Sequence, residues 1–105
     1  MKPIFEDIPL IKNTAKKRFE IEVNGKYAFI NYGEFRNQIA LVHTEVEPEL
    51  EGSGAASAVV EKTLHYIEDN NLKLLPFCPY VFAYIKRFPE WKRIVSEKFK
   101  GYDKL

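Results

Sequence analysis

The sequence has little of the features that mark several classes of protein. Its 105 residues include one cysteine, Cys78, so no disulfide can form within the chain and nothing indicates an oxidising compartment. No apolar run comes near the roughly 18–20 residues that a membrane-spanning helix needs. The segment Met1–Asp7 carries acidic side chains where a secretory signal has its apolar core. We therefore expect a cytoplasmic protein with no membrane partner.

The chain also has little excess of charge of either sign, with a formal net charge of +1. Bulk electrostatics therefore does not recruit a polyanion such as a nucleic acid. The exception is residues 86–104, which carry seven Lys or Arg side chains against three acidic ones. Because a mixed stretch of this kind is more often a solvated helix face than a binding surface, we expect no nucleic-acid partner.

Large apolar side chains, by contrast, are plentiful. The chain has eight Phe, six Tyr and one Trp, and 46% of its residues are hydrophobic. Such side chains can supply the core of a folded unit, and 105 residues is within the usual size of one domain. We therefore predict a single domain over residues 1–105.

The first half of the chain predicts three consecutive strands. Residues 19–23 alternate apolar and charged side chains, which is the pattern of a half-buried strand. Asn24-Gly25 is a strong signal for a hairpin turn, and residues 27–32 suit the return strand. A second turn over 33–37 then leads to a longer strand over 38–46. Tight turns between consecutive strands predict an antiparallel meander.

The second half changes to a helix–strand–helix pattern. Apolar residues at helical spacing predict an amphipathic helix over 55–70, and residues 73–78 predict a short strand. Pro79 suits the first position of the next helix, expected over 80–87, and another short helix is expected over 90–99. The order β-β-β-α-β-α predicts a mixed α/β (α+β) fold whose first helix packs on the sheet.

The stretch from Gly52 to Ser57 is the most informative for function. Small residues at a strand–loop–helix junction let backbone N–H groups approach a ligand, and a helix N-terminus favours an anion such as a phosphate. The two common phosphate fingerprints fail, because Ala55-Ala56 follows Gly54 where a P-loop has a lysine, and a serine replaces the third dinucleotide glycine. On these residues alone, a phosphate site and a plain tight loop are equal alternatives.

A third pattern fits this loop. It resembles the pyrophosphate-binding motif of the GNAT acetyltransferases, Gln/Arg-x-x-Gly-x-Gly/Ala, with Gly54 and Ala56 on the last two fixed positions and Glu51 at the first. Residues 82–88 are similar to the helix of that family whose tyrosine can protonate the departing CoA thiolate. More specifically, the chain resembles the small, single-domain YjdJ-type branch of the superfamily, at His43-Thr44-Glu45-Val46, Cys78-Pro79-Tyr80-Val81 and Tyr84.

The resemblance implies a minimal GNAT fold and a place for each part of acetyl-CoA. It implies that the strands ending at Val46 and Cys78 splay apart into a wedge, which holds the pantetheine arm against the backbone around Thr44, Glu45 and Val46. The pyrophosphate would rest on backbone N–H groups of the glycine loop, defined as Gly52, Ser53, Gly54, Ala55, Ala56 and Ser57. The thioester would then point between the strand ends.

Several side chains near that point are candidates for the chemistry. His43 is the candidate proton acceptor for an amine nucleophile. Glu45 or Glu47 is the alternative, acting through water, although solvation explains Glu47 more simply. Cys78 is either a nucleophile that takes the acetyl group or a wall of the site. Tyr84 is either the general acid for the thiolate or a core aromatic.

These observations predict an N-acetyltransferase that moves an acetyl group from acetyl-CoA to an amine that the sequence does not identify. The alternative is a CoA-binding or protein-interaction module with little turnover, which the acidic Glu51 favours. The expected partners are coenzyme A and the amine acceptor. No metal site is predicted, and the oligomeric state stays open.

Overall fold

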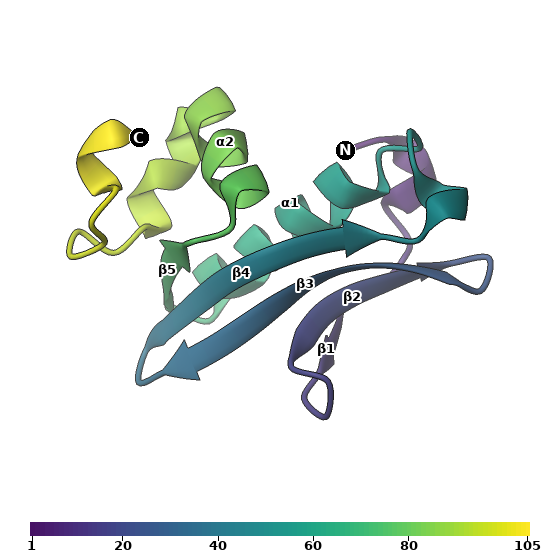
Figure 1. Cartoon of the computed structure of the whole chain (residues 1–105), viewed down its shortest axis with the longest axis horizontal. Helices are drawn as coiled ribbons and strands as arrows, with labels where there is room; N and C mark the ends of the chain where they lie inside the picture. The colour runs from purple at the N-terminus through teal and green to yellow at the C-terminus, as the bar shows by residue number, and fades with distance from the viewer.

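The computed structural model describes all residues from 1 to 105 and arranges five strands in one sheet, in the order β1-β2-β3-β4-β5 (Figure 1). Strands β1 to β4 pair antiparallel, and β5 pairs parallel with β4. The strands are β1 (Ile11–Asn13), β2 (Arg18–Val23), β3 (Lys26–Phe35), β4 (Gln38–Val46) and β5 (Lys73–Pro76). The predicted meander and the mixed α+β class are confirmed.

Two α-helices follow the meander, separated by β5. They are α1 (Ala55–Asp69) and α2 (Pro79–Arg87), which confirm the helices predicted over 55–70 and 80–87. Neither helix combines the length and the apolar character needed to cross a membrane. Four 3₁₀ turns complete the fold: η1 (Pro3–Phe5), η2 (Pro48–Leu50), η3 (Pro89–Ile94) and η4 (Tyr102–Lys104).

The prediction of a helix over 90–99 is wrong, because only the six-residue 3₁₀ turn η3 forms there. The chain becomes extended at Val95, which makes a parallel bridge to Leu74 of β5. The Ser96 N–H then donates to the Leu74 carbonyl at 2.9 Å. Pairing with the exposed edge of β5 therefore replaces the helix that the local pattern favoured.

Of the two predicted turns of the meander, the first is confirmed and the second is shorter than predicted. Asn24 and Gly25 join β2 to β3 with φ angles of 52° and 80°, both left-handed, as the hairpin signal requires. The turn expected over 33–37 is shorter, because β3 continues to Phe35 and pairs with β4 up to that residue. The connection consists of residues 36–37 alone, with Arg36 in the left-handed region at φ 56°.

Helix α1 and the face of the sheet that it covers form the core. The buried stripe of α1 includes Val59, Leu64 and Ile67, and each fully buried aliphatic side chain of this kind contributes about 1.5–3 kcal/mol. The sheet supplies a row of buried residues, which are Phe19, Ile21, Ala28, Ile30, Tyr32, Ile39 and Leu41. In Figure 1, α1 lies behind the sheet, and no helix covers the opposite face, which we call the outer face.

Strand β4 carries a β-bulge at Val42. Leu41 and His43 pair with consecutive residues of β3, so Val42 between them has no partner on that strand. An extra residue of this kind bends a strand and increases its twist. The bulge therefore changes the direction of β4 just before its last residues.

Strands β4 and β5 part at the same level. They pair only over residues 38–41 of β4, and the last bond runs from the Cys78 N–H to the Leu41 carbonyl at 2.8 Å. Residues 42–46 continue past the end of β5 with no strand on that side. This is the parting of the two strands that the resemblance to the GNAT family implies, although β5 ends at Pro76 and not at Cys78 as predicted.

Candidate functional site

The loop between β4 and α1 has a backbone that only glycine adopts without strain. Gly52 and Gly54 have φ angles of 77° and 93°, in the left-handed region. The side chain of Ser53 folds back, and its hydroxyl donates to the Leu50 carbonyl at 2.6 Å. The two glycines and Ser53 thus turn the chain into the first residue of α1 without placing a bulky side chain over the helix end.

The first turn of α1 has free backbone donors. The earliest backbone hydrogen bond of the helix runs from the Ala58 N–H to the Gly54 carbonyl at 3.0 Å, and no side chain caps the helix from Gly54. The Ala55 N–H reaches the Ser53 hydroxyl at 3.2 Å, whereas the N–H groups of Gly54, Ala56 and Ser57 have no partner within the chain. Such donors, together with the positive end of the helix dipole, suit a phosphate.

A groove runs from this helix end along α2. It has a volume of about 270 Å³ and is lined by Ser57, Tyr80, Ala83, Tyr84, Arg87 and Phe88. A neighbouring hollow of about 410 Å³ shares Ser57, Tyr84 and Phe88 and extends along α1 to Glu61 and His65. Of the residues with free N–H groups, Ser57 therefore lines a concave surface between the two helices.

Tyr84 and Tyr80 stand one turn apart on α2 and both face that groove. The Tyr84 hydroxyl donates to Oε1 of Glu61 at 3.4 Å. Burial, with a smaller contribution from Glu61, raises the pKa of Tyr84 to about 12. Burial also raises the pKa of Tyr80, whose side chain is 43% exposed. Both phenols are therefore protonated, and hence able to donate, at neutral pH.

Cys78 stands at the point where β4 and β5 part. It is 2% exposed, and its Sγ lies 3.3 Å from Oγ1 of Thr44 on β4. Its carbonyl accepts the Phe82 N–H at 2.9 Å, so Cys78 is the N-cap of α2. Backbone bonds to β4 on one side and to α2 on the other hold the thiol in place.

His43 and Glu45 form a second pair, on the opposite face of β4. His43 Nε2 lies 3.1 Å from Glu45 Oε1, and the two side chains are 60% and 59% exposed. His43 pairs across the strands with Asn31 and Glu45 pairs with Phe29, which places all four on the outer face.

The sequence-predicted residues thus fall into two groups. Thr44 and Val46 pair with the buried Ile30 and Ala28, so they face the helices, as Cys78 does. His43 and Glu45 face the other way, because successive residues of a strand point to opposite faces. No hydrogen bond or ion pair joins the His43–Glu45 pair to Cys78 or Tyr84.

Comparison with known proteins identifies the fold around this site. The sequence model of the GCN5-related N-acetyltransferase family matches residues 18–94, which span β2 to η3. The chain belongs to this family. Its structure is similar to the NMR solution structure of a GCN5-like protein from Staphylococcus aureus, with a TM-score of 0.64 and 21% identity over 87% of this chain and 90% of that one.

Within this GCN5-related fold, several neighbours of the candidate residues were not predicted. Glu61, which accepts a hydrogen bond from Tyr84, lies one helical turn after Ser57. This spacing on the predicted helix could have indicated that Glu61 shares a face with Ser57. Asn31 and Phe29 lie beside His43 and Glu45 only because of the strand register. No group of three His, Cys, Asp or Glu side chains is arranged to hold a metal ion.

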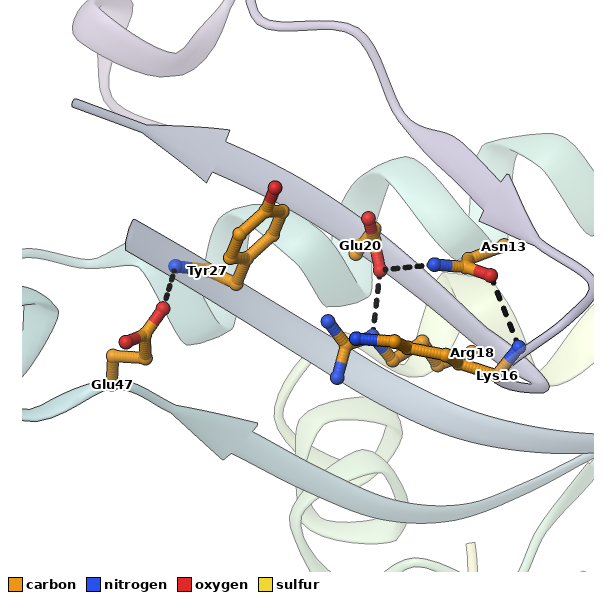
Figure 2. A network of polar contacts seen from close by, with 6 residues as sticks. All are labelled: Asn13, Lys16, Arg18, Glu20, Tyr27 and Glu47. Atoms are coloured by element: carbon orange, nitrogen blue, oxygen red, sulfur yellow. Dashed lines mark hydrogen bonds and ion pairs between the residues drawn. The ribbon is translucent and has the colours of Figure 1, made fainter. Parts of the chain in front are cut away.

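Glu47, weighed as a possible proton relay, has a different role in this acetyltransferase fold. Its carboxylate accepts the Tyr27 N–H at 2.7 Å, as Figure 2 shows. The Glu47 N–H in turn donates to the Tyr27 carbonyl at 3.0 Å. Glu47 therefore extends the pairing of β3 beyond the end of β4 instead of being solvated.

Proposed function

We propose that this protein transfers the acetyl group of acetyl-CoA to an amine acceptor. The observation that carries the proposal is the set of free N–H groups of Gly54, Ala56 and Ser57, beside the unpaired end of β4. In this arrangement the pyrophosphate of CoA binds to the glycine loop. Membership of the GCN5-related N-acetyltransferase family, which generally uses acetyl-CoA, supports the same ligand.

The pantetheine arm then lies between the end of β4 and the groove along α2. The backbone of residues 44–46 has no strand partner on this side, so it has hydrogen-bonding groups for the amides of pantetheine. In this proposal the thioester lies at the level of Thr44 and Cys78, where β4 and β5 part. This side chain pair forms one wall of the acetyl site.

The transfer is a direct displacement at the thioester carbonyl. The amine nitrogen attacks the carbonyl carbon to form a tetrahedral intermediate, which collapses with cleavage of the C–S bond and departure of the CoA thiolate. His43, held by Glu45, accepts the proton that the amine loses, and Tyr84 donates a proton to the thiolate. Holding amine and thioester together supplies much of the acceleration.

The acceptor approaches from the outer face, because His43 lies there and no helix covers that face. The acetyl group is then presented through the gap between β4 and β5. Exposure of His43 and Glu45 leaves room for an amine carried on a large molecule as well as for a small one.

Calorimetric titration with CoA tests the ligand, and a matched pair of variants tests the loop. Asn and Asp are nearly equal in size and, after glycine, occur most often in left-handed backbone, so the two variants carry similar strain at residue 54 and differ in charge. We expect Gly54→Asp to bind CoA at least about tenfold more weakly than Gly54→Asn, because its carboxylate stands beside the pyrophosphate. Absence of heat and saturation with the unmodified protein, or equal affinity of the two variants, contradicts the site.

A second measurement separates an enzyme from a binding module. Loss of the thioester of acetyl-CoA is followed with a panel of small amines and lysine-containing peptides. Turnover with any member supports the transferase. Binding of CoA without turnover across the panel favours the interaction module instead.

A further inference from the structure

The N-terminal segment brings a lysine to the glycine loop. Nζ of Lys2 donates to the Ser53 carbonyl at 3.0 Å. The stem of the same side chain passes beside Gly54, where an added Cβ would meet Cδ and Cε of Lys2 at 3.4 Å and Nζ at 3.6 Å. The ammonium group therefore lies at the first turn of α1, next to the free N–H groups.

The backbone of Lys2 is held in place by the residues that follow it. Phe5 is 2% exposed and belongs to the core. Its N–H donates to the Lys2 carbonyl at 3.0 Å, which closes the 3₁₀ turn η1. Burial of Phe5 thus holds residues 2–5 against the core. The backbone of Lys2 is thereby held close enough for its side chain to contact the loop.

The charges around the loop make this cation important for an anionic ligand. Glu51 has no ion-pair partner, and Glu49 is paired with Lys26 at 3.4 Å. The residues that precede the glycine loop in sequence are therefore acidic, and the negative charge of Glu51 opposes binding of a pyrophosphate. Lys2 is the cation whose charged atom contacts the loop itself, and it comes from outside the segment over which the family match extends.

The geometry also leaves the ammonium able to bind a ligand. A lysine has three N–H donors, and the Ser53 carbonyl takes one of them, which leaves two. These two N–H groups lie at the same helix end as the free Ser57 N–H.

We propose that Lys2 binds the pyrophosphate of coenzyme A and supplies the positive charge that the glycine loop lacks at Glu51. This inference rests on the proposed function, since it assigns a residue to the same ligand. It makes the N-terminal segment a part of the binding site, although that segment lies far from the loop in sequence.

The test compares Lys2→Gln with Lys16→Gln, which removes an equal charge from the exposed turn between β1 and β2. Affinities for CoA, 3′-dephospho-CoA and pantetheine are measured by calorimetry. We expect Lys2→Gln to weaken binding of CoA and of 3′-dephospho-CoA about tenfold, the effect of one charge-assisted hydrogen bond. Pantetheine, which has no phosphate, should bind both variants alike, and Lys2→Arg should keep most of the affinity for CoA.

Each outcome decides the inference. If Lys2→Gln binds CoA as well as Lys16→Gln does, the inference is wrong while the proposed function stands. If the loss disappears with 3′-dephospho-CoA, Lys2 contacts the 3′-phosphate and the assignment to the pyrophosphate is overturned. If the unmodified protein binds no CoA, the proposed function fails and the inference fails with it. Matching thermal unfolding midpoints of the two glutamine variants establish that both are folded.

Discussion

The Sγ atom of Cys78 lies 3.3 Å from Oγ1 of Thr44, and this contact joins the N-cap of α2 to β4 where β4 and β5 part. His43, the neighbour of Thr44, points to the other face of β4 and pairs with Glu45 instead. A cysteine nucleophile is activated by a base within hydrogen-bond reach or by a helix N-terminus. Cys78 is the N-cap of α2, but its side-chain neighbour is a threonine hydroxyl, which is not a base. Because no base contacts the thiol, we propose that Cys78 is a wall of the site and not the nucleophile.

From these contacts we expect Cys78→Ala to keep the greater part of the transferase activity. The variant should lose about 1 kcal/mol of stability, since a small buried side chain is shortened. Single-turnover measurements of thioester loss give the activity, and urea denaturation gives the stability. Mass spectrometry of the unmodified protein after mixing with acetyl-CoA should find Cys78 unacetylated. An acetylated Cys78 that disappears when amine is added would establish the covalent route and refute this expectation.

Sequence patterns specify local elements better than they specify which residues meet. Asn24-Gly25 and the apolar stripe of α1 carry their own geometry, and both predictions are confirmed. Strand β1 has three residues and no periodicity, because it forms by pairing with β2. Such pairing depends on the register of distant segments, which no local pattern encodes.

The same reason limits prediction of the site. The glycine loop was visible because its chemistry is in consecutive residues. The bulge at Val42 was not visible, although it sets the direction of residues 43–46. Glu47 has an acidic, proline-flanked context typical of a solvated linker, yet its partner is a backbone N–H twenty residues away at Tyr27.

The raised pKa of Tyr84 gives a prediction for activity and one for stability. With a pKa of about 12, Tyr84 keeps its proton throughout the usual assay range. At any pH below about 10, therefore, deprotonation of Tyr84 should not reduce kcat. Replacing it by Phe should reduce kcat about 100-fold with little change in the KM for acetyl-CoA, as expected for a general acid. Tyr80→Phe is the matched control on the same helix face. Equal kcat values for the two variants would remove Tyr84 from the mechanism.

The effect on stability has a definite sign. The pKa of Tyr84 is about 12 in the folded protein against 10.0 for an unperturbed tyrosine, so between these values the unfolded chain releases a proton that the folded protein keeps. This contribution to stability is complete below pH 10 and is lost as the pH rises towards 12. The urea midpoint should therefore fall less in Tyr84→Phe than in the unmodified protein between about pH 9 and pH 11.5. An identical fall in both proteins would contradict the assignment.

Arg18 and Glu20 on the outer face provide a test of the fold. Glu20 is 5% exposed and accepts from Arg18 Nε at 2.6 Å and from Asn13 Nδ2 at 3.2 Å (Figure 2). Arg18 also covers the ring of Phe29 at 4.1 Å. We expect Arg18→Met to lower the free energy of unfolding by about 2–3 kcal/mol, because a buried carboxylate loses its cation.

Urea denaturation of Arg18→Met measures this loss, and Lys26→Met is the control. Lys26 pairs with Glu49 at the surface, where an ion pair contributes little to stability. The urea midpoint of Lys26→Met should therefore equal that of the unmodified protein. Adding Glu20→Gln to Arg18→Met should restore part of the stability, since the unpaired charge is then gone. A double variant as unstable as the sum of the single variants would mean that Arg18 acts through its contact with Phe29 alone.

Deletion of Val42 tests whether the bulge makes the site. Val42 has no partner on β3, and without it Leu41 and His43 would become consecutive residues opposite the consecutive residues Tyr32 and Asn31. The deletion therefore keeps the pairing and both faces of β4 while it straightens the strand. We expect a folded protein with a normal unfolding midpoint and CoA affinity at least about tenfold lower, because a straight β4 narrows the gap beside β5 that the pantetheine arm needs. Circular dichroism, thermal unfolding and calorimetry with CoA give the three readings. Unchanged affinity in a folded deletion variant would mean that the gap between β4 and β5 arises from the early end of β5 and owes nothing to the bulge.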